Sequence, residues 1–483
     1  MTAAEGTLRR VVIDPVTRVE GHGRVSLLLD DQNRVQQARL HIVEFRGFER
    51  FIQGRPFWEV PVLVQRLCGI CPVSHHLAAA KAMDWIVGGE RLTPTAEKIR
   101  RLMHYGQMLQ SHALHFFHLC SPDLLFGFES DPVQRNIVGV ARRHPELAVQ
   151  GVMLRKYGQE VIRATAGKKI HGTGAIPGGV NKSLTAAERD ALLRDFEPVP
   201  ARARAAVALA RDYTLAHARE LADFAVFDSN HLSLIRADGA MDLYHGGLRA
   251  VNARGETILD HVDYRDYLAY IGEEVRAWTY LKFPFIRTLG PERGWYRVGP
   301  LARINTADRI DTPEADAALA EFRRALGRPC NATMAYHWAR MIELLHAAEK
   351  IGLLLDDPDI TGADLVTRGE RREEAVGLLE APRGTLFHHY RVNAQDQVVM
   401  ANLIVSTTNN NESMNRAVRD VAARRVSGHE VTEGLLNTIE VAIRAYDPCL
   451  SCATHALGQM PLTVEMIDAA GRTVARRQRD EPR

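Results

Sequence analysis

The sequence predicts an α+β protein that is predominantly helical, with a long-helix bundle at its core and small β-sheets near the N-terminus and in the C-terminal part. Residues 8–45 are rich in β-branched and aliphatic residues, which are typical of strands. From about residue 57, apolar residues recur instead at spacings of three and four, which is the period of an amphipathic helix. Strand-like runs return only near residue 385.

The individual elements follow from local signals. GRVSLLLDDQNRVQQARLHIVEF (23–45) predicts two strands joined by a turn at Asp30 to Asn33. Thr93 as N-cap, with Pro94 at the first helical position, predicts the start of a helix that runs to about Leu119. Because Ala, Leu and Arg are frequent beyond this helix, we expect the middle of the chain to be helical. We expect further helices at about 146–166, 199–224, 312–327, 331–356 and 429–446, strands at 385–393 and 398–405, and a last hairpin at 464–474.

Composition excludes several classes of protein. The chain has 483 residues, of which 46% are hydrophobic and 25% charged, as in an ordinary globular protein with a large core. Its formal net charge of +2 gives no electrostatic case for binding nucleic acid. The N-terminus lacks the apolar segment of a secretory signal, and no run of about 18 apolar residues could span a bilayer. We therefore expect no export signal and no direct membrane insertion.

A glycine-rich segment, GTGAIPGG (172–179), invites comparison with dinucleotide-binding loops. Its spacing is not G-x-G-x-x-G, it follows a basic stretch rather than a buried strand, and Pro177 stands where a helix should begin. We interpret it as a tight structural loop.

Four of the six cysteines form two Cys-x-x-Cys pairs, Cys68/Cys71 and Cys449/Cys452. Two cysteines three residues apart can direct both sulfurs at one ion, so each pair can act as a bidentate clip. Four thiolates suit zinc, an iron-sulfur cluster, or nickel and iron, and the sequence separation does not decide among these. Because one site would need both pairs, we expect the two ends of the chain to meet in a single core.

Nearby histidines extend this candidate site. His75 lies one helical turn after Cys71, where its imidazole could donate a hydrogen bond to a metal-bound sulfur. His455 follows Cys452 by three residues and could be a third ligand to the same metal or a ligand to a second one. We interpret His76 as a core or surface residue. The isolated Cys120 and Cys330 are interpreted as small buried hydrophobic residues.

Six segments spread over the whole chain form a recognisable set of motifs. They are, in order, TRVEGHGRV (17–25), EFRGFE (44–49), RLCGICPVSHHLAAAKAMD (66–84), HFFHL (115–119), APRGTLFHHY (381–390) and DPCLSCATH (447–455). On these segments the chain resembles the large, catalytic subunit of nickel-iron hydrogenases, and among these most the cytoplasmic, bidirectional NAD-reducing type.

The resemblance implies a nickel-iron centre held by all four cysteines. Cys68 and Cys449 would be terminal ligands of nickel, and Cys71 and Cys452 would bridge to iron. The iron carries carbon monoxide and cyanide in this family, so dedicated metal-insertion and maturation proteins are implied. No iron-sulfur cluster or flavin is expected in this chain, because no further cysteine pairs remain for a cluster.

Other residues take roles through their position in these motifs. Arg383 and Thr407 would donate hydrogen bonds to the cyanide ligands, although Ser406 and Thr408 adjoin Thr407. Pro382 would pack near the carbonyl ligand, and Arg383 could also help to polarise hydrogen. Glu20 would accept the proton produced when hydrogen is cleaved.

Glu49 and His455 would ligate a magnesium or iron ion near the active site, with Glu44 as the competing carboxylate. In this family an endopeptidase cuts after the last histidine, here between His455 and Ala456. We therefore expect residues 1–455 to form one intertwined domain and 456–483 to be an extension removed on maturation. A permanent terminal hairpin is the alternative.

The implied partners are an iron-sulfur small subunit and flavin subunits that reduce NAD, in the cytoplasm. Three alternatives remain open. A hydrogen sensor could use the same scaffold, and so could a non-catalytic relative like the quinone-side subunit of respiratory complex I, which lacks the four cysteines. The third is a plain zinc protein.

Overall fold

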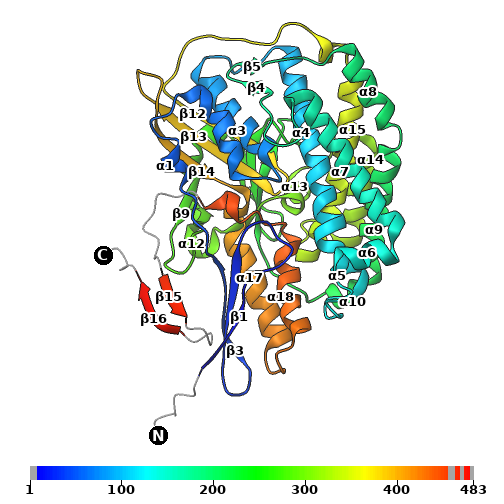
Figure 1. Cartoon of the computed structure of the whole chain (residues 1–483), viewed down its shortest axis with the longest axis vertical. Helices are drawn as coiled ribbons and strands as arrows, with labels where there is room; N and C mark the ends of the chain where they lie inside the picture. Colours follow the sequence, from blue (N-terminus) through cyan, green and yellow to red (C-terminus); the bar gives the residue numbers. More distant parts are fainter. Residues whose placement is uncertain (1–7, 455–462, 468–472, 479–483) are drawn as a thin grey trace.

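The computed structural model describes residues 8–454, 463–467 and 473–478. Its architecture is α+β, as predicted, with long helices gathered on one side of the molecule and small sheets on the other (Figure 1). One hydrophobic core cluster contains residues from Ile13 to Ala453. The N-terminal and C-terminal parts of the described chain therefore share a core.

Four long helices form the bundle, and shorter helices cover them. α4 packs against both α7 and α15, and α15 packs against α9. The four are α4 (Pro94–Leu114), α7 (Pro145–Ala166), α9 (Val199–Ala216) and α15 (Tyr336–Asp356). Around them lie α5 (Ser121–Phe126), α6 (Ile137–Arg143), α8 (Ala186–Phe196), α10 (Ala218–Leu221) and α14 (Pro313–Leu326).

Helices α4 and α7 approach each other closely because each carries a glycine at the crossing. A Cβ atom added to Gly158 would lie 2.6 Å from the carbonyl oxygen of Gly106. One added to Gly106 would lie 2.8 Å from the side chain of Val161. Both distances are well inside the optimum for carbon contacts, so larger residues would push the two helices apart.

The predicted start of α4 is confirmed. The side chain of Thr93 accepts a hydrogen bond from the backbone N–H of Ala96 over 3.2 Å, and Pro94 occupies the first turn. Beyond Leu114 the helix continues as a π-helical turn, η3 (His115–Cys120).

Two three-stranded antiparallel sheets occupy the regions predicted to contain strands. The N-terminal sheet has the order β1-β2-β3 and the later one β12-β13-β14. A Cβ atom on Gly377 of β12 would lie 2.0 Å from the carbonyl oxygen of Ala78, so this glycine allows α3 (Pro72–Ile86) to lie directly on the sheet. The strands are β1 (Arg9–Ile13), β2 (Gly23–Leu29), β3 (Val35–Ile42), β12 (Glu374–Ala381), β13 (Gly384–Val392) and β14 (Val398–Ile404).

The expectation of a helical middle is wrong for residues 230–297, which form two further sheets. One has the order β11-β6-β7-β8 and the other pairs β10 with β9. Every residue of β6 is buried, so the polar-apolar alternation that reveals a half-exposed strand is absent. These strands are β6 (Asn230–Ile235), β7 (Gly247–Val251), β8 (Thr257–Val262), β9 (Ile271–Glu274), β10 (Phe283–Ile286) and β11 (Tyr296–Arg297).

Short elements connect these layers. The GTGAIPGG segment contains the small hairpin of β4 (Ala175–Ile176) and β5 (Gly179–Val180), and the predicted last hairpin forms from β15 (Thr463–Ile467) and β16 (Thr473–Gln478). Helices of the second half are α13 (Pro300–Thr306), α16 (Ser406–Asn409), α17 (Asn411–Val421) and α18 (Glu433–Ala445). Single turns include α1 (Phe48–Phe51), α2 (Val60–Leu63), α11 (Tyr267–Tyr270) and α12 (Gly290–Arg293).

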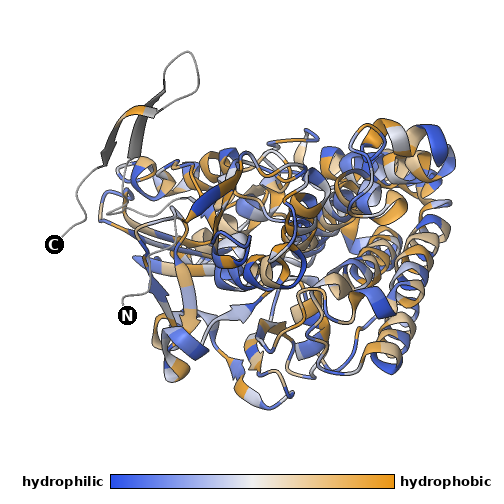
Figure 2. Cartoon of the chain, turned by 90° about the horizontal axis from the view of Figure 1, so that it is seen from below, coloured by the Kyte–Doolittle hydropathy of each residue, from blue (hydrophilic) through white to orange (hydrophobic). Residues whose placement is uncertain are grey.

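Figure 2 shows hydrophilic and hydrophobic residues on the same long helices, as expected where one side is buried and the other faces water. Among the described helices, none combines the length and the apolarity needed to cross a bilayer.

Candidate metal centre

Two loops from opposite ends of the chain bring four cysteines together. Cys68 follows the 3-10 turn η2 (Val64–Leu67), and Cys71 immediately precedes α3. Cys449 and Cys452 lie beyond the C-terminus of α18. The four sulfur atoms all lie within 4.8 Å of one another, and all four residues are buried.

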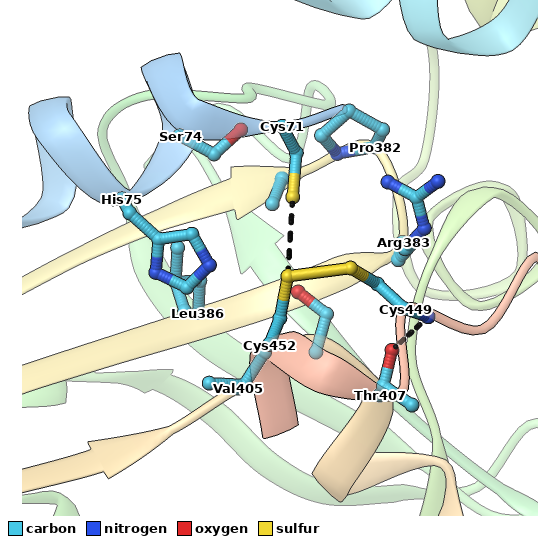
Figure 3. A pocket seen from close by; sticks show the side chains of 12 residues that line it. Cys71, Ser74, His75, Pro382, Arg383, Leu386, Val405, Thr407, Cys449 and Cys452 are labelled. Carbon is cyan, nitrogen blue, oxygen red and sulfur yellow. Dashed lines mark hydrogen bonds between the residues drawn. A yellow bond between two sulfur atoms is a disulfide. The ribbon is translucent and has the colours of Figure 1, made fainter. Parts of the chain in front are cut away.

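The sulfurs are not equivalent in this structure. Cys449 and Cys452 are joined as a disulfide (Figure 3), whereas Cys68 and Cys71 are free thiols. A metal binds thiolates, so the Cys449–Cys452 pair has to be reduced before both sulfurs can act as ligands. With that reduction, the donor set is the one that soft metals such as nickel prefer.

The two free thiols share a hydrogen bond. The Cys71 thiol donates to Cys68 over 2.9 Å, and this hydrogen bond, together with burial, raises the pKa of Cys71. Burial also disfavours the Cys68 thiolate, but the bond from Cys71 and the charge of Arg383 outweigh burial and lower the pKa of Cys68. Of these two thiols, Cys68 therefore loses its proton more readily.

A small cavity lies beside the sulfurs and receives side chains from three further elements (Figure 3). α3 contributes Ser74 and His75, the β12–β13 turn contributes Pro382 and Arg383, and the start of α16 contributes Thr407.

Arg383 is fixed at the tip of the β12–β13 hairpin by Asp447. Its Nε donates to the backbone oxygen of Asp447 over 2.6 Å, and a terminal nitrogen donates to the carboxylate over 3.0 Å. The other terminal nitrogen is buried and has no hydrogen-bond partner in the described part of the chain. An unpaired buried donor costs about 1–3 kcal/mol. A ligand with an acceptor atom in this cavity, such as cyanide, fits this position.

The structure distinguishes the three hydroxyls at the start of α16. Ser406 donates to the carbonyl oxygen of Gly384 over 2.7 Å, and Thr408 donates to that of Ala453 over 3.4 Å. Thr407 accepts a hydrogen bond from the backbone N–H of Cys449 over 2.9 Å. Across the described residues, no acceptor is found for the hydroxyl proton of Thr407, so this group remains able to donate into the cavity.

Glu20 lies between the sulfurs and the protein surface. Its backbone pairs with that of Cys449 in an isolated parallel bridge, and its Oε2 lies 2.9 Å from the Cys449 sulfur. The same oxygen accepts the backbone N–H of Ser451 over 3.2 Å, and the Ser451 hydroxyl donates to Oε1. Ser451 also lines an open surface pocket with Glu44, Phe45 and Arg46. Sequence reasoning missed Ser451, although it stands between the two cysteines of the clip.

The two candidate carboxylates for a second metal differ in burial. Glu49 is 4% exposed, and its Oε1 accepts the backbone N–H of Leu403 over 2.8 Å. Glu44 is half-buried and pairs with the exposed His22. The backbone N–H of Arg46 donates to the carbonyl oxygen of Thr454, which brings the Glu49 segment beside the end of the described chain. His455 itself lies outside the described residues.

His75 and His76 have different surroundings. His76 is a core residue: one ring nitrogen lies 2.7 Å from the carbonyl oxygen of Pro61, and the other accepts the backbone N–H of Ala175 over 2.9 Å. His75 lines the cavity, and its Nδ1 lies 3.1 Å from Nε2 of His388.

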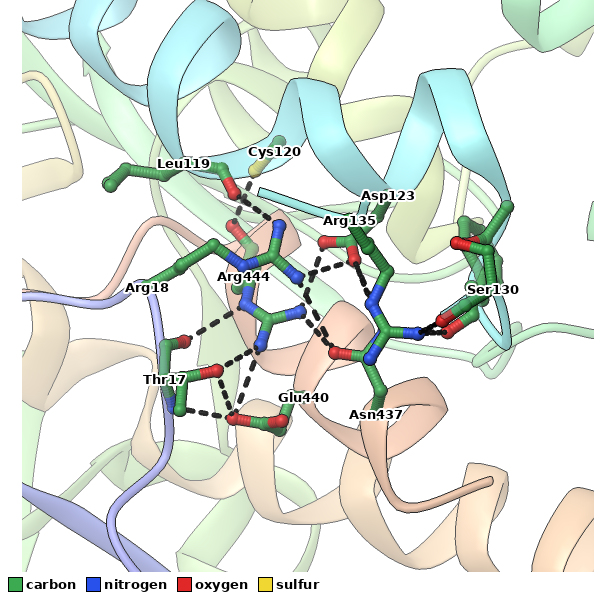
Figure 4. A network of polar contacts seen from close by, with 12 residues as sticks. Thr17, Arg18, Leu119, Cys120, Asp123, Ser130, Arg135, Asn437, Glu440 and Arg444 are labelled. Atoms are coloured by element: carbon green, nitrogen blue, oxygen red, sulfur yellow. Dashed lines mark hydrogen bonds and ion pairs between the residues drawn. The ribbon is translucent and has the colours of Figure 1, made fainter. Parts of the chain in front are cut away.

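A buried charge network positions both halves of the site (Figure 4). The carboxylate of Asp123 on α5 accepts from Arg18 over 2.6 Å and from Arg444 over 3.0 Å. Arg18 lies two residues before Glu20, and Arg444 lies five residues before Cys449. Arg444 also donates to the backbone oxygen of Thr17 over 2.9 Å. The network therefore ties the Glu20 segment to the loop that carries Cys449.

A second group of donor atoms is formed by His115, Cys120 and His337. The His115 ring is already hydrogen-bonded to the carbonyl oxygen of Arg444 over 2.6 Å, and the guanidinium of Arg340 lies nearby in the same buried region. The positive charge of Arg340 disfavours the binding of a metal ion here, so we interpret these three residues as part of the core. Cys120 is 2% exposed, and Cys330, at 4%, is likewise buried as expected.

Comparisons with known proteins bear on the whole chain. The family model described as "Nickel-dependent hydrogenase" matches residues 46–126 and 221–455, and one described as "HoxL-like" matches residues 10–45. The NAD-reducing hydrogenase HoxS subunit beta of Cupriavidus necator is 50% identical over 98% of this chain and 100% of its own length. One subunit of the F420-non-reducing hydrogenase vhc of Methanococcus voltae is 40% identical over 94% of this chain and 96% of its own length.

Solved structures of hydrogenases have the same fold as this chain. A crystal structure of an NAD+-reducing [NiFe]-hydrogenase in the H2-reduced state superposes with a TM-score of 0.91 at 55% identity, covering 93% of this chain and all of that one. The Ni-Fe-Se hydrogenase of D. vulgaris Hildenborough has the same fold, with a TM-score of 0.74 at 22% identity and the same coverage. The chain thus belongs to the nickel-dependent hydrogenase family.

Proposed function

We propose that this chain is the catalytic large subunit of an NAD-reducing nickel-iron hydrogenase, which cleaves H2 reversibly into protons and electrons. The main support is the meeting of four cysteine sulfurs, from opposite ends of the chain, beside one buried cavity. In the proposed arrangement Cys68 and Cys449 would be terminal nickel ligands, and Cys71 and Cys452 would be the ligands shared with iron. When bound, such a centre would supply the Lewis acidity that heterolysis of H2 requires and would take up the two electrons that the reaction releases.

The cavity residues bind and orient the diatomic ligands of the iron. The unpartnered terminal nitrogen of Arg383 and the free hydroxyl proton of Thr407 would donate to the two cyanide nitrogens. Pro382 presents an apolar surface on which carbon monoxide can pack without a hydrogen bond. Asp447 holds the guanidinium of Arg383 in the orientation that points its free nitrogen into the cavity.

Glu20 carries the proton away from the site. Its carboxylate is within hydrogen-bonding reach of the Cys449 sulfur on one side and of the Ser451 hydroxyl on the other. Ser451 in turn lines a pocket that opens to solvent. A proton taken from the sulfur by Glu20 therefore has a short route to the surface.

Glu49 and His455 would hold a magnesium or iron ion. The burial of Glu49 favours it over the half-buried Glu44, since a carboxylate enclosed by protein has fewer competing water molecules. Cleavage between His455 and Ala456 would remove residues 456–483 and leave a single 1–455 domain. Before metal insertion, the disulfide between Cys449 and Cys452 would have to take up two electrons and two protons from a thiol reductant.

The proposed partners follow from the NAD-reducing relatives. Electrons leave through an iron-sulfur small subunit and reach NAD on flavin-containing diaphorase subunits, in the cytoplasm. Metal-insertion proteins and the maturation endopeptidase act earlier. The presence of all four cysteines argues against the non-catalytic alternative related to complex I.

The test uses the chain co-produced with its small and diaphorase subunits and its maturation proteins. Nickel in the assembled complex, infrared bands of carbon monoxide and cyanide, and H2-dependent reduction of both a viologen dye and NAD+ are the expected results. Zinc alone at the cysteines refutes the function. Dye reduction without NAD+ reduction refutes only the acceptor, and a loaded centre with negligible turnover indicates a hydrogen sensor instead.

A further inference from the structure

A chain of hydrogen bonds runs from the cavity into the sheet behind it. Nδ1 of His75 lies 3.1 Å from Nε2 of His388, and Nδ1 of His388 lies 2.6 Å from the hydroxyl oxygen of Tyr390. His75 is 1% exposed, and the other two residues are fully buried. The chain therefore begins on α3, one turn beyond Cys71, and ends on β13.

The direction of these bonds decides what His75 offers to the cavity. Burial disfavours a charged imidazole, and the described hydrogen-bond partner of His75 is another imidazole rather than a carboxylate, so its ring is neutral and carries one proton. Burial also raises the pKa of Tyr390, so its phenol keeps the proton that it can donate. If Tyr390 donates to Nδ1 of His388, then Nε2 of His388 carries a proton and donates to Nδ1 of His75. The proton of His75 is then on Nε2.

That nitrogen faces the metal ligands. Figure 3 shows the ring of His75 beside Cys71 and Cys452, with one nitrogen on the side of the sulfurs. We propose that Tyr390 and His388 are positioning residues that fix the tautomer of His75, so that His75 presents an N–H donor to a cysteine sulfur. The inference rests on the proposed function, because the sulfurs concerned are those of the metal centre.

If the hydrogen bonds between Tyr390, His388 and His75 ran in the reverse direction, His75 would offer the sulfurs no N–H donor. Glu49 lies close enough for its charge to act on Tyr390. A phenol that donated to Glu49 would accept from His388, and His75 would then face the sulfurs with a lone pair. Only the first direction stabilises a thiolate, since a lone pair repels it.

The same strand supplies a matched control. Tyr267 forms a similar bond, with its hydroxyl 3.1 Å from Nδ1 of His389. His389 adjoins His388, but successive side chains of a strand point to opposite faces of a sheet. Tyr267→Phe thus removes a buried hydroxyl from a histidine of β13 without touching the cavity.

The experiment compares infrared spectra of the assembled enzyme carrying Tyr390→Phe, His388→Gln or Tyr267→Phe. A sulfur that loses a hydrogen bond donates more electron density to the iron, which weakens the carbon-oxygen bond of its carbonyl ligand. We expect the carbon monoxide band to move to lower frequency in Tyr390→Phe and His388→Gln, and to stay in place in Tyr267→Phe. Nickel content should be unchanged in all three.

Two results would overturn the inference. A carbon monoxide band in Tyr390→Phe that stays in place or moves to higher frequency excludes a donor at His75. Equal shifts in Tyr390→Phe and Tyr267→Phe would reveal a general effect of losing a buried hydroxyl. If the wild-type enzyme lacks carbon monoxide and cyanide bands, the proposed metal centre itself is refuted. That outcome is distinguishable from a failure of the hydrogen-bond chain through His388 and Tyr390, which leaves the bands present.

Discussion

Neutralising Asp123 tests whether the network in Figure 4 holds the two halves of the site together. Asp123 is 1% exposed, and its carboxylate faces the guanidinium groups of Arg18, Arg444 and Arg135, the last at 3.7 Å. In Asp123→Asn, Glu440 is the one buried acid among the described residues that still pairs with these arginines, through Arg444. Removing one partner of a buried ion pair costs about 3–5 kcal/mol. We expect the lower end, about 3 kcal/mol, because asparagine keeps one oxygen acceptor.

The assay is thermal unfolding of the metal-free full-length chain. An unfolding entropy of about 2.1 cal/mol/K per residue gives a chain of this length about 1 kcal/mol/K, so a loss of about 3 kcal/mol lowers the Tm by about 3 °C. Glu433→Gln is the matched control, since Glu433 also pairs with Arg135 but is 58% exposed and should contribute about 0–1 kcal/mol. Equal Tm values for wild type and Asp123→Asn would refute the assigned role of the network.

Four further changes probe the site and the core. Cys449→Ser should abolish nickel incorporation and H2 oxidation, and retained activity would contradict the ligand assignment. Glu20→Gln should suppress hydrogen-deuterium exchange at unchanged metal content, whereas normal exchange would argue against a proton-transfer role. Thr407→Val should shift a cyanide stretching band and Thr408→Val should not, because the Thr408 hydroxyl donates to Ala453, whereas no described residue accepts the Thr407 proton. Burial lowers the pKa of Lys81 in the folded protein to about 7, whereas an unfolded lysine has a pKa of about 10.4. Between these two pH values the Lys81 side chain is protonated in the unfolded chain and neutral in the folded one. The stability of the wild type should therefore rise with pH in this window by up to about 1.4 kcal/mol per unit relative to Lys81→Met, and parallel stability curves would exclude the shift.

Local signals were sufficient where a few neighbouring residues decide the structure. Thr93 and Pro94 predicted the start of α4 because capping and proline geometry act within one turn. The strands of residues 230–297 escaped prediction because they are short and because β6, which pairs with both β7 and β11, is buried along its whole length, so partners rather than a periodic pattern determine them. Likewise, no sequence signal separated Thr407 from Ser406 and Thr408, since their acceptors lie on distant segments.

The sequence by itself determined the donor chemistry: two cysteine clips, their neighbouring histidines, and a fold class set by the change from strand to helix periodicity. Only the tertiary structure decided which groups meet, including Ser451 beside Glu20, Asp447 behind Arg383, and His388 with Tyr390 behind His75. The physical reason is one of range. Propensity and capping act over a few residues of the same segment, whereas hydrogen bonds within a buried site join atoms that are hundreds of residues apart and depend on how the whole core packs.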